Sequence, residues 1–142
     1  MKTKIAIILM LIFILSSQAA ISSVIQDWYW SNTMKIFYDL IIDLEDLTFL
    51  IDNFEHQDNI TYEDVYDKII ESKSKARDFS KQAIELYELS LDKDFHLDLV
   101  SMINGYELSL VLLIDGIEEG NFYKIEAAAF LMDSIGNMMM EL

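Results

Sequence analysis

Hydrophobic residues recur at three- and four-residue steps along four segments of the chain, which is the spacing of one face of an α-helix. In the first segment Ile36, Leu40 and Leu47 follow this spacing, while Asp39 and Asp46 lie on another face. No segment alternates apolar and polar residues over the length of a strand. The pattern therefore predicts an all-α fold.

The ends of the four helices are marked by capping residues and glycine. We expect helices over residues 23–55, 62–91, 95–119 and 122–141. The first begins at Ser23, whose spacing to Gln26 fits a capping box, or after Thr33. The hydroxyl of Thr61 caps the second helix and Asp94 the third.

A short connection around Gly120, a residue suited to a left-handed helix end, makes the last two helices antiparallel neighbours. The simplest architecture is an up-down-up-down four-helix bundle that forms one domain over residues 20–142.

The N-terminus has the features of an export signal. Lys2 and Lys4 precede an apolar run over residues 5–15, and small residues follow at Ser17 and Ala19. This order predicts a secretory signal peptide over residues 1–19, cleaved after Ala19. It implies a secreted or extracytoplasmic protein, periplasmic or on the cell surface.

A membrane anchor is the alternative interpretation of the same segment. Residues 5–25 form a stretch of 21 residues without charge. As a helix at 1.5 Å per residue this stretch would cross about 30 Å of hydrocarbon. Trp28 and Trp30 would then lie where an aromatic belt belongs. Either interpretation places residues 26–142 outside the cytosol.

Composition narrows the classes of function. The chain has 25 acidic against 10 basic residues, a formal net charge of −15. Loss of residues 1–19 removes two lysines and no acids, which makes the charge −17. Such a surface disfavours nucleic acid, and the absence of cysteine excludes disulfides, thiolate metal sites and Cys-x-x-Cys-His haem attachment.

The sequence contains no constellation of residues for catalysis. Its two histidines, His56 and His96, lie near predicted helix ends and lack the Glu-x-x-His spacing of di-iron bundles. We therefore expect both to face solvent or to cap helices. No nucleophile elbow, phosphate-binding loop or zinc motif occurs, so the prediction is a non-enzyme without cofactor or metal.

Two minor sites are predicted from local pattern. Asp39, Asp43 and Asp46 share a helical face, which we expect to be solvated, with weak cation binding as the alternative. Asn59, in the sequence Asn59-Ile60-Thr61, is an acceptor site for an N-linked glycan in an exported chain.

The third and fourth helices carry more apolar surface than one bundle needs. Leu108, Val111 and Leu112 fall on or beside the polar side of the third helix. The fourth helix ends in the flexible apolar side chains of Met138, Met139 and Met140. These six residues form the predicted partner face.

The first hypothesis for function is a non-enzymatic protein-interaction module. Its strong acidity favours a basic partner, as in an inhibitor or immunity-like protein, and self-association is the other outcome for such a face. The alternative is a small-ligand or cation-binding bundle that acts as a sensor or carrier. Its pocket would be lined by aromatic residues, namely Trp28, Trp30, Phe37, Tyr62, Tyr66, Phe79, Tyr87, Tyr106, Phe122 and Phe130.

Overall fold

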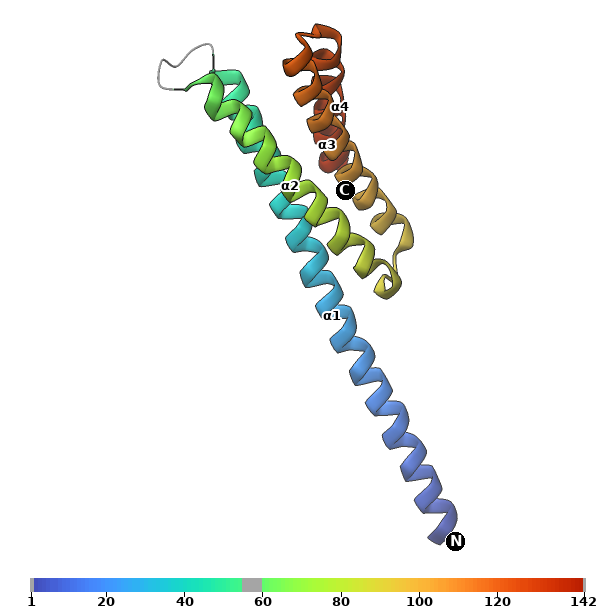
Figure 1. Cartoon of the computed structure of the whole chain (residues 1–142). Coiled ribbons are helices and arrows are strands. Elements are labelled where there is room, and N and C mark those ends of the chain that lie inside the picture. Colours follow the sequence, from blue (N-terminus) through green and yellow to red (C-terminus); the bar gives the residue numbers. More distant parts are fainter. Residues whose placement is uncertain (1, 55–59, 142) are drawn as a thin grey trace.

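The computed structural model describes the backbone of residues 2–54 and 60–141 and the side chains of residues 21–54 and 60–140. The helices are α1 (Lys2–Asn53), α2 (Tyr62–Leu86), the single 3-10 turn η1 (Tyr87–Leu89), α3 (Lys93–Glu119) and α4 (Phe122–Glu141). No strand occurs over the described ranges, so the all-α prediction is confirmed. Successive helices run in alternating directions, and the first half of α1 extends beyond the other helices (Figure 1).

The first helix is longer than the sequence analysis predicts. Helix α1 continues without a break through Ser23 and Thr33, so neither residue begins it. The physical reason is that the chain has no proline and no glycine before Gly105, and nothing in this segment interrupts helical hydrogen bonding. The predicted cleavage site after Ala19 falls on residues whose side chains lie outside the described set.

The start of α2 is held by a reciprocal cap. The hydroxyl of Thr61 accepts a hydrogen bond from the Asp64 amide at 3.1 Å, and the Asp64 carboxylate accepts from the Thr61 amide at 2.7 Å. This capping box satisfies two donors that the helix cannot satisfy itself. The predicted cap at Thr61 is confirmed.

The connection between α2 and α3 differs from the prediction. Helix α2 gives way to η1 after Leu86, and Asp92 rather than Asp94 caps α3 by accepting from the Phe95 amide at 2.9 Å. Asp92 can cap because its backbone is not helical, whereas Asp94 already lies in the first turn. Gly120 ends α3 with φ of 63°, the left-handed conformation that the sequence predicts.

Helix α3 forms the centre of the molecule. Leu99, Ile103 and Leu110 are fully buried along it, and α2 and α4 pack on either side. Helix α4 approaches α3 closely at Gly116, where a β-carbon would lie 2.8 Å from Cγ1 of Ile125. Glycine is therefore required there for the close approach of the two helices.

Among the residues with described side chains, α3 is the one helix long and apolar enough to cross a membrane, with a mean hydropathy of 1.6. The core helix of a bundle meets the same criteria, and its position between α2 and α4 accounts for the apolarity of α3. By contrast, α1 packs mainly on α2 and touches α4 only slightly.

Candidate functional site

A buried carboxylate joins three helices. Asp43 on α1 is 2% exposed. Its Oδ1 accepts hydrogen bonds from Lys68 at 2.9 Å and from Lys75 at 3.0 Å, both on α2. Its Oδ2 accepts from the hydroxyl of Tyr106 on α3 at 2.9 Å. The charge of Asp43 is therefore fully compensated inside the protein.

The charges around Asp43 set the protonation of the cluster. Burial raises the pKa of Asp43, but the hydrogen bonds from Lys68, Lys75 and Tyr106 outweigh burial and hold it below its usual value. Burial and the nearby Asp43 charge raise the pKa of Tyr106, so its phenol stays neutral and donates. The hydrogen bond to Glu71 and the proximity of Asp43 raise the pKa of Lys75. Asp43 is therefore ionised at neutral pH, and its hydrogen bonds tie α1 to α2 and α3.

The expectation of a solvated face over Asp39, Asp43 and Asp46 is therefore wrong at its centre. Asp46 is 62% exposed, with its carboxylate 3.7 Å from Lys68, but Asp43 is enclosed. At Asp43 itself, the ammonium groups of Lys68 and Lys75 already occupy the position that a bound cation would take. Over the side chains that the structure describes, no group of three or more His, Asp or Glu residues is arranged to hold a metal ion.

The second histidine is buried, contrary to the expectation of a solvent-facing or capping residue. His96 is 0% exposed, with Nε2 2.6 Å from the Ala83 carbonyl and Nδ1 3.0 Å from the Tyr29 hydroxyl. Because a carbonyl only accepts, Nε2 donates to it, and in the neutral ring Nδ1 accepts from Tyr29. His96 thus links α1, α2 and α3.

The position of His96 could have been found from the sequence. It stands three residues before Leu99 and seven before Ile103, on the apolar stripe of α3. Its position near the predicted helix start is equally typical of a capping residue. His56 and the predicted glycan acceptor Asn59 lie outside the described residues.

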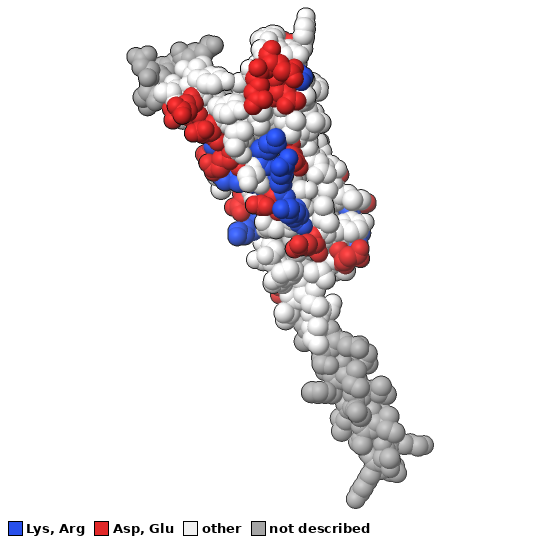
Figure 2. All heavy atoms as spheres, viewed as in Figure 1, with Lys and Arg blue, Asp and Glu red and all other residues white. Residues whose placement is uncertain are grey.

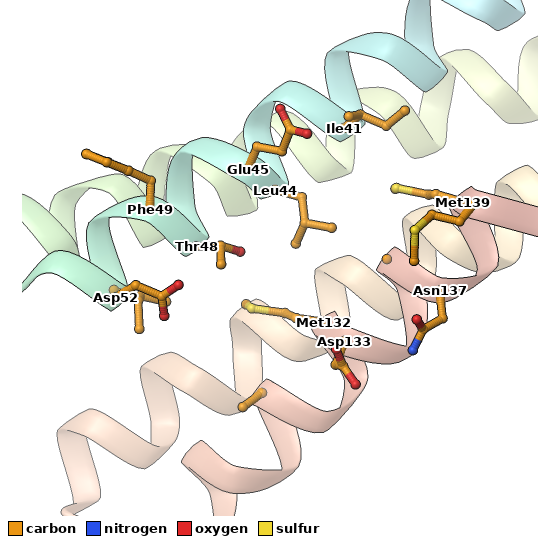
Figure 3. Close-up of a pocket in the computed structure, with 14 residues that line it drawn as sticks. Ile41, Leu44, Glu45, Thr48, Phe49, Asp52, Met132, Asp133, Asn137 and Met139 are labelled. Carbon is orange, nitrogen blue, oxygen red and sulfur yellow. The ribbon is translucent and has the colours of Figure 1, made fainter.

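A groove of about 720 Å³ lies between α1 and α4. Leu44 and Thr48 point from α1 toward α4, and Met132 and Met139 lie on the facing side (Figure 3). The groove exists because α4 packs along α3 and makes only slight contact with α1. The lining residues are Ile41, Leu44, Glu45, Thr48, Phe49, Ile51 and Asp52 of α1 and Ala129, Met132, Asp133, Gly136, Asn137, Met139 and Met140 of α4.

The groove combines an apolar lining with acidic edges. Its charged lining residues are Glu45, Asp52 and Asp133, all exposed, and no basic residue lines it. Methionines contribute three of the apolar side chains, which adapt their shape more readily than branched residues. The site can receive an apolar surface flanked by positive charge.

Only part of the predicted partner face takes part in this groove. Met139 and Met140 line it, whereas Met138 does not. Leu108 is 51% exposed on α3, and Val111 and Leu112 are half-buried there, away from the groove lining. The structure thus does not bring the leucines of α3 and the methionines of α4 to one groove.

The contribution of α1 to the groove was missed in the sequence analysis. The width of the apolar stripe on α1 indicates this contribution in the sequence. Ile41 adjoins Leu40, and the two side chains cannot both face one neighbouring helix. The aromatic residues predicted to line a ligand pocket do not line this groove. Tyr106 and Phe79 are buried in the core, Phe122 and Phe130 are exposed on α4, and none of the ten aromatic candidates lines the groove.

Basic side chains gather on a different surface. They form a column in the middle of the face in Figure 2, where α2 lies, with acidic side chains toward both ends. Arg77 of α2 pairs with Glu107 of α3 at 2.8 Å, and Lys81 lies 3.7 Å from Asp78. The basic residues of α2 therefore leave the acidic edges of the groove uncompensated.

Comparison with protein-family models, with curated proteins and with solved structures finds no match for this chain.

Proposed function

We propose that this protein is an exported, non-enzymatic interaction module that binds a basic helix of a partner protein in the groove between α1 and α4. The observation that carries the proposal is the lining of this groove, with apolar side chains on both walls and carboxylates at its edges. An inhibitor or immunity-like protein that neutralises a basic toxin or enzyme is one form of this function.

The dimensions of the groove favour a helix as the occupant. Its α1 wall runs over residues 41–52, which corresponds to about 16 Å or three helical turns. Recognition of a helix in a groove uses apolar anchors at i, i+3 or i+4 and i+7, a span that three turns contain. A helix bound in the groove would pack against both α1 and α4.

The charge of the groove favours a basic occupant. Glu45, Asp52 and Asp133 are solvent-exposed, so each can pair with a cation of the partner without the cost of burying a lone charge. The net charge of −15 adds long-range attraction and speeds the encounter with cations. A second copy of this acidic chain would be repelled at the same edges.

A pair of synthetic helices tests the proposal. Both peptides have the same apolar face, and one has lysine where the other has glutamine on the flanks. Titration of the full chain, followed by fluorescence anisotropy of the labelled peptide, should give at least tenfold tighter binding for the lysine peptide at low salt, or about 1.4 kcal/mol. This advantage should shrink as salt screens the acidic edges.

The variant Gly136→Leu tests whether the peptide binds in the groove between α1 and α4. Gly136 lines the groove and a β-carbon there meets nothing within 4 Å, so we expect a leucine at this position to extend into the groove. We expect at least tenfold weaker binding, about 1.4 kcal/mol. Ala127→Leu adds the same side chain to an exposed position of α4 outside the groove lining and should leave binding unchanged. Equal binding by wild type and Gly136→Leu would rule out the groove.

The volume of the groove also supports a small apolar ligand as a second candidate, because ligand pockets typically measure 300–1,000 Å³. A ligand that binds only the folded state raises the melting temperature. A panel of fatty acids and other apolar ligands should then stabilise wild type but not Gly136→Leu. No stabilisation by any member of the panel would remove this candidate.

A further inference from the structure

Helix α1 exposes apolar side chains just before it enters the bundle. Tyr29 is fully buried, while Ile21, Val24, Ile25 and Trp28 are 59, 66, 42 and 52% exposed. The helix is continuous across this point, and Figure 1 shows its first half extending away from the other helices. Four large apolar side chains within about two helical turns thus lie largely exposed.

A second apolar group lies at the same end of the molecule. In the turn between α2 and α3, Leu91 is 80% exposed and Leu89 is 37% exposed. His96 places Ala83 of α2 level with Tyr29 of α1. From Ala83 to Leu89 the chain advances about 10 Å along the bundle axis, toward the N-terminus of α1. This distance equals the rise of about seven residues of α1. Leu89 and Leu91 therefore lie near the level of Ile21 and Ile25.

We propose that residues 5–25 of α1 stay attached and span a lipid bilayer, with the tip of the α2–α3 turn inserted into its outer leaflet. Trp28 and Trp30 lie in the headgroup region, and Leu89 and Leu91 enter the outer edge of the hydrocarbon beside Ile21 and Ile25. This proposal is independent of the groove and concerns where the protein displays it.

The protruding part of α1 has the length and the uncharged sequence of a membrane-spanning helix. No charged residue occurs between Lys4 and Asp27, and residues 5–25 as a helix match the roughly 30 Å of a hydrocarbon core. The two lysines before this stretch favour a cytoplasmic N-terminus. Cleavage after Ala19 would instead leave the apolar group of residues 21–28 in water.

Aromatic contacts between α1 and α3 fix the distance of the bundle from the proposed membrane surface. The ring of Trp30 lies 5.4 Å from that of Phe95 at the start of α3, and it lies 5.2 Å from that of Tyr29. Trp30 therefore belongs to both the bundle and the aromatic belt that tryptophan forms at membrane interfaces. The groove, at residues 41–52 of α1, would lie about 24–40 Å from Ile25 along the helix axis, outside the bilayer.

Intrinsic fluorescence tests the proposed orientation, because Trp28 and Trp30 are the two tryptophans of the chain. The full chain is reconstituted into phosphatidylcholine vesicles whose acyl chains are brominated near the headgroup. We expect these lipids to quench more than half of the emission. The control carries Trp28→Phe, Trp30→Phe and Phe122→Trp, which moves the fluorophore to an exposed position at the start of α4. It should not be quenched.

Equal quenching of the control, or no quenching of the native tryptophans, would overturn the orientation. Retention of the anchor is tested separately by expression of the full chain in a bacterium with signal peptidase. The intact mass of the membrane fraction after alkaline carbonate washing should correspond to an uncleaved helix. A chain that begins at Ala20, or that the wash releases, would overturn the proposal.

Discussion

At the scale of single residues, the buried polar groups determine how the helices are registered. Asp43 and His96 both sit within apolar stripes and both find partners on two other helices. Each therefore specifies one arrangement of α1, α2 and α3, because any other would leave a buried charge or ring nitrogen without a partner.

Removal of the Asp43 carboxylate should cost far more stability than removal of a neighbouring one. Asp43→Ala leaves the ammonium of Lys68, on a side chain only 12% exposed, without its acceptor, and we expect a loss of about 3 kcal/mol. Asp46→Ala, one turn further along α1, removes an exposed carboxylate 3.7 Å from Lys68 and should cost less than about 1 kcal/mol. Urea unfolding measures both, and equal losses would contradict the structural role of Asp43.

The same cluster predicts a loss of stability in acid. The folded pKa of Asp43 lies below its value in the unfolded chain, so its contribution is complete above an unfolded pKa of about 3.9. It is lost as the pH falls through the folded pKa. Urea unfolding at a series of pH values from about 5 downward should show a shallower acid decline for Asp43→Asn than for wild type. If the free energies of unfolding of wild type and Asp43→Asn fell in parallel with pH, this role of Asp43 would be contradicted.

At the scale of elements, two glycines of similar sequence setting have opposite effects. Gly120 adopts φ of 63° at the end of α3, whereas Gly136 lies inside α4 with open space around it. Gly120→Ala should destabilise by about 1 kcal/mol through left-handed strain. Gly136→Ala should stabilise by about 0.5–1 kcal/mol through helix propensity. Thermal unfolding distinguishes the signs, and a shift of Tm in the same direction for both would contradict the assignment.

The helix ends show how far local pattern reaches. Thr61 and Gly120 were predicted correctly, because a capping box and a left-handed glycine depend on neighbours within four residues. Asp92 was missed in favour of Asp94, since both acids stand within reach of the same helix start. The unbroken passage through Ser23 was also missed, because a capping motif does not stop a helix whose preceding residues are themselves helical.

At the scale of the whole molecule, the interactions are unevenly distributed. The Asp43 and His96 clusters fasten α1, α2 and α3 to one another, while α4 is held mainly by α3. Helix α4 can pack closely there because Gly116 and Gly105 admit Ile125 and Ile135. This imbalance opens the groove between α1 and α4, and with it the surface on which the proposed function depends.

Apolar periodicity, the absence of proline and the acidic composition by themselves determined that this chain is helical and strongly negative, because these are sums over local or compositional properties. Only the tertiary structure decided that Asp43 and His96 are buried. It also decided that Met139, and not Leu108, lines the groove beside α1. Those outcomes depend on which helices become neighbours and on how closely they approach. A carboxylate is on the surface or inside according to whether another helix brings it a cation, and no spacing within one helix contains that information.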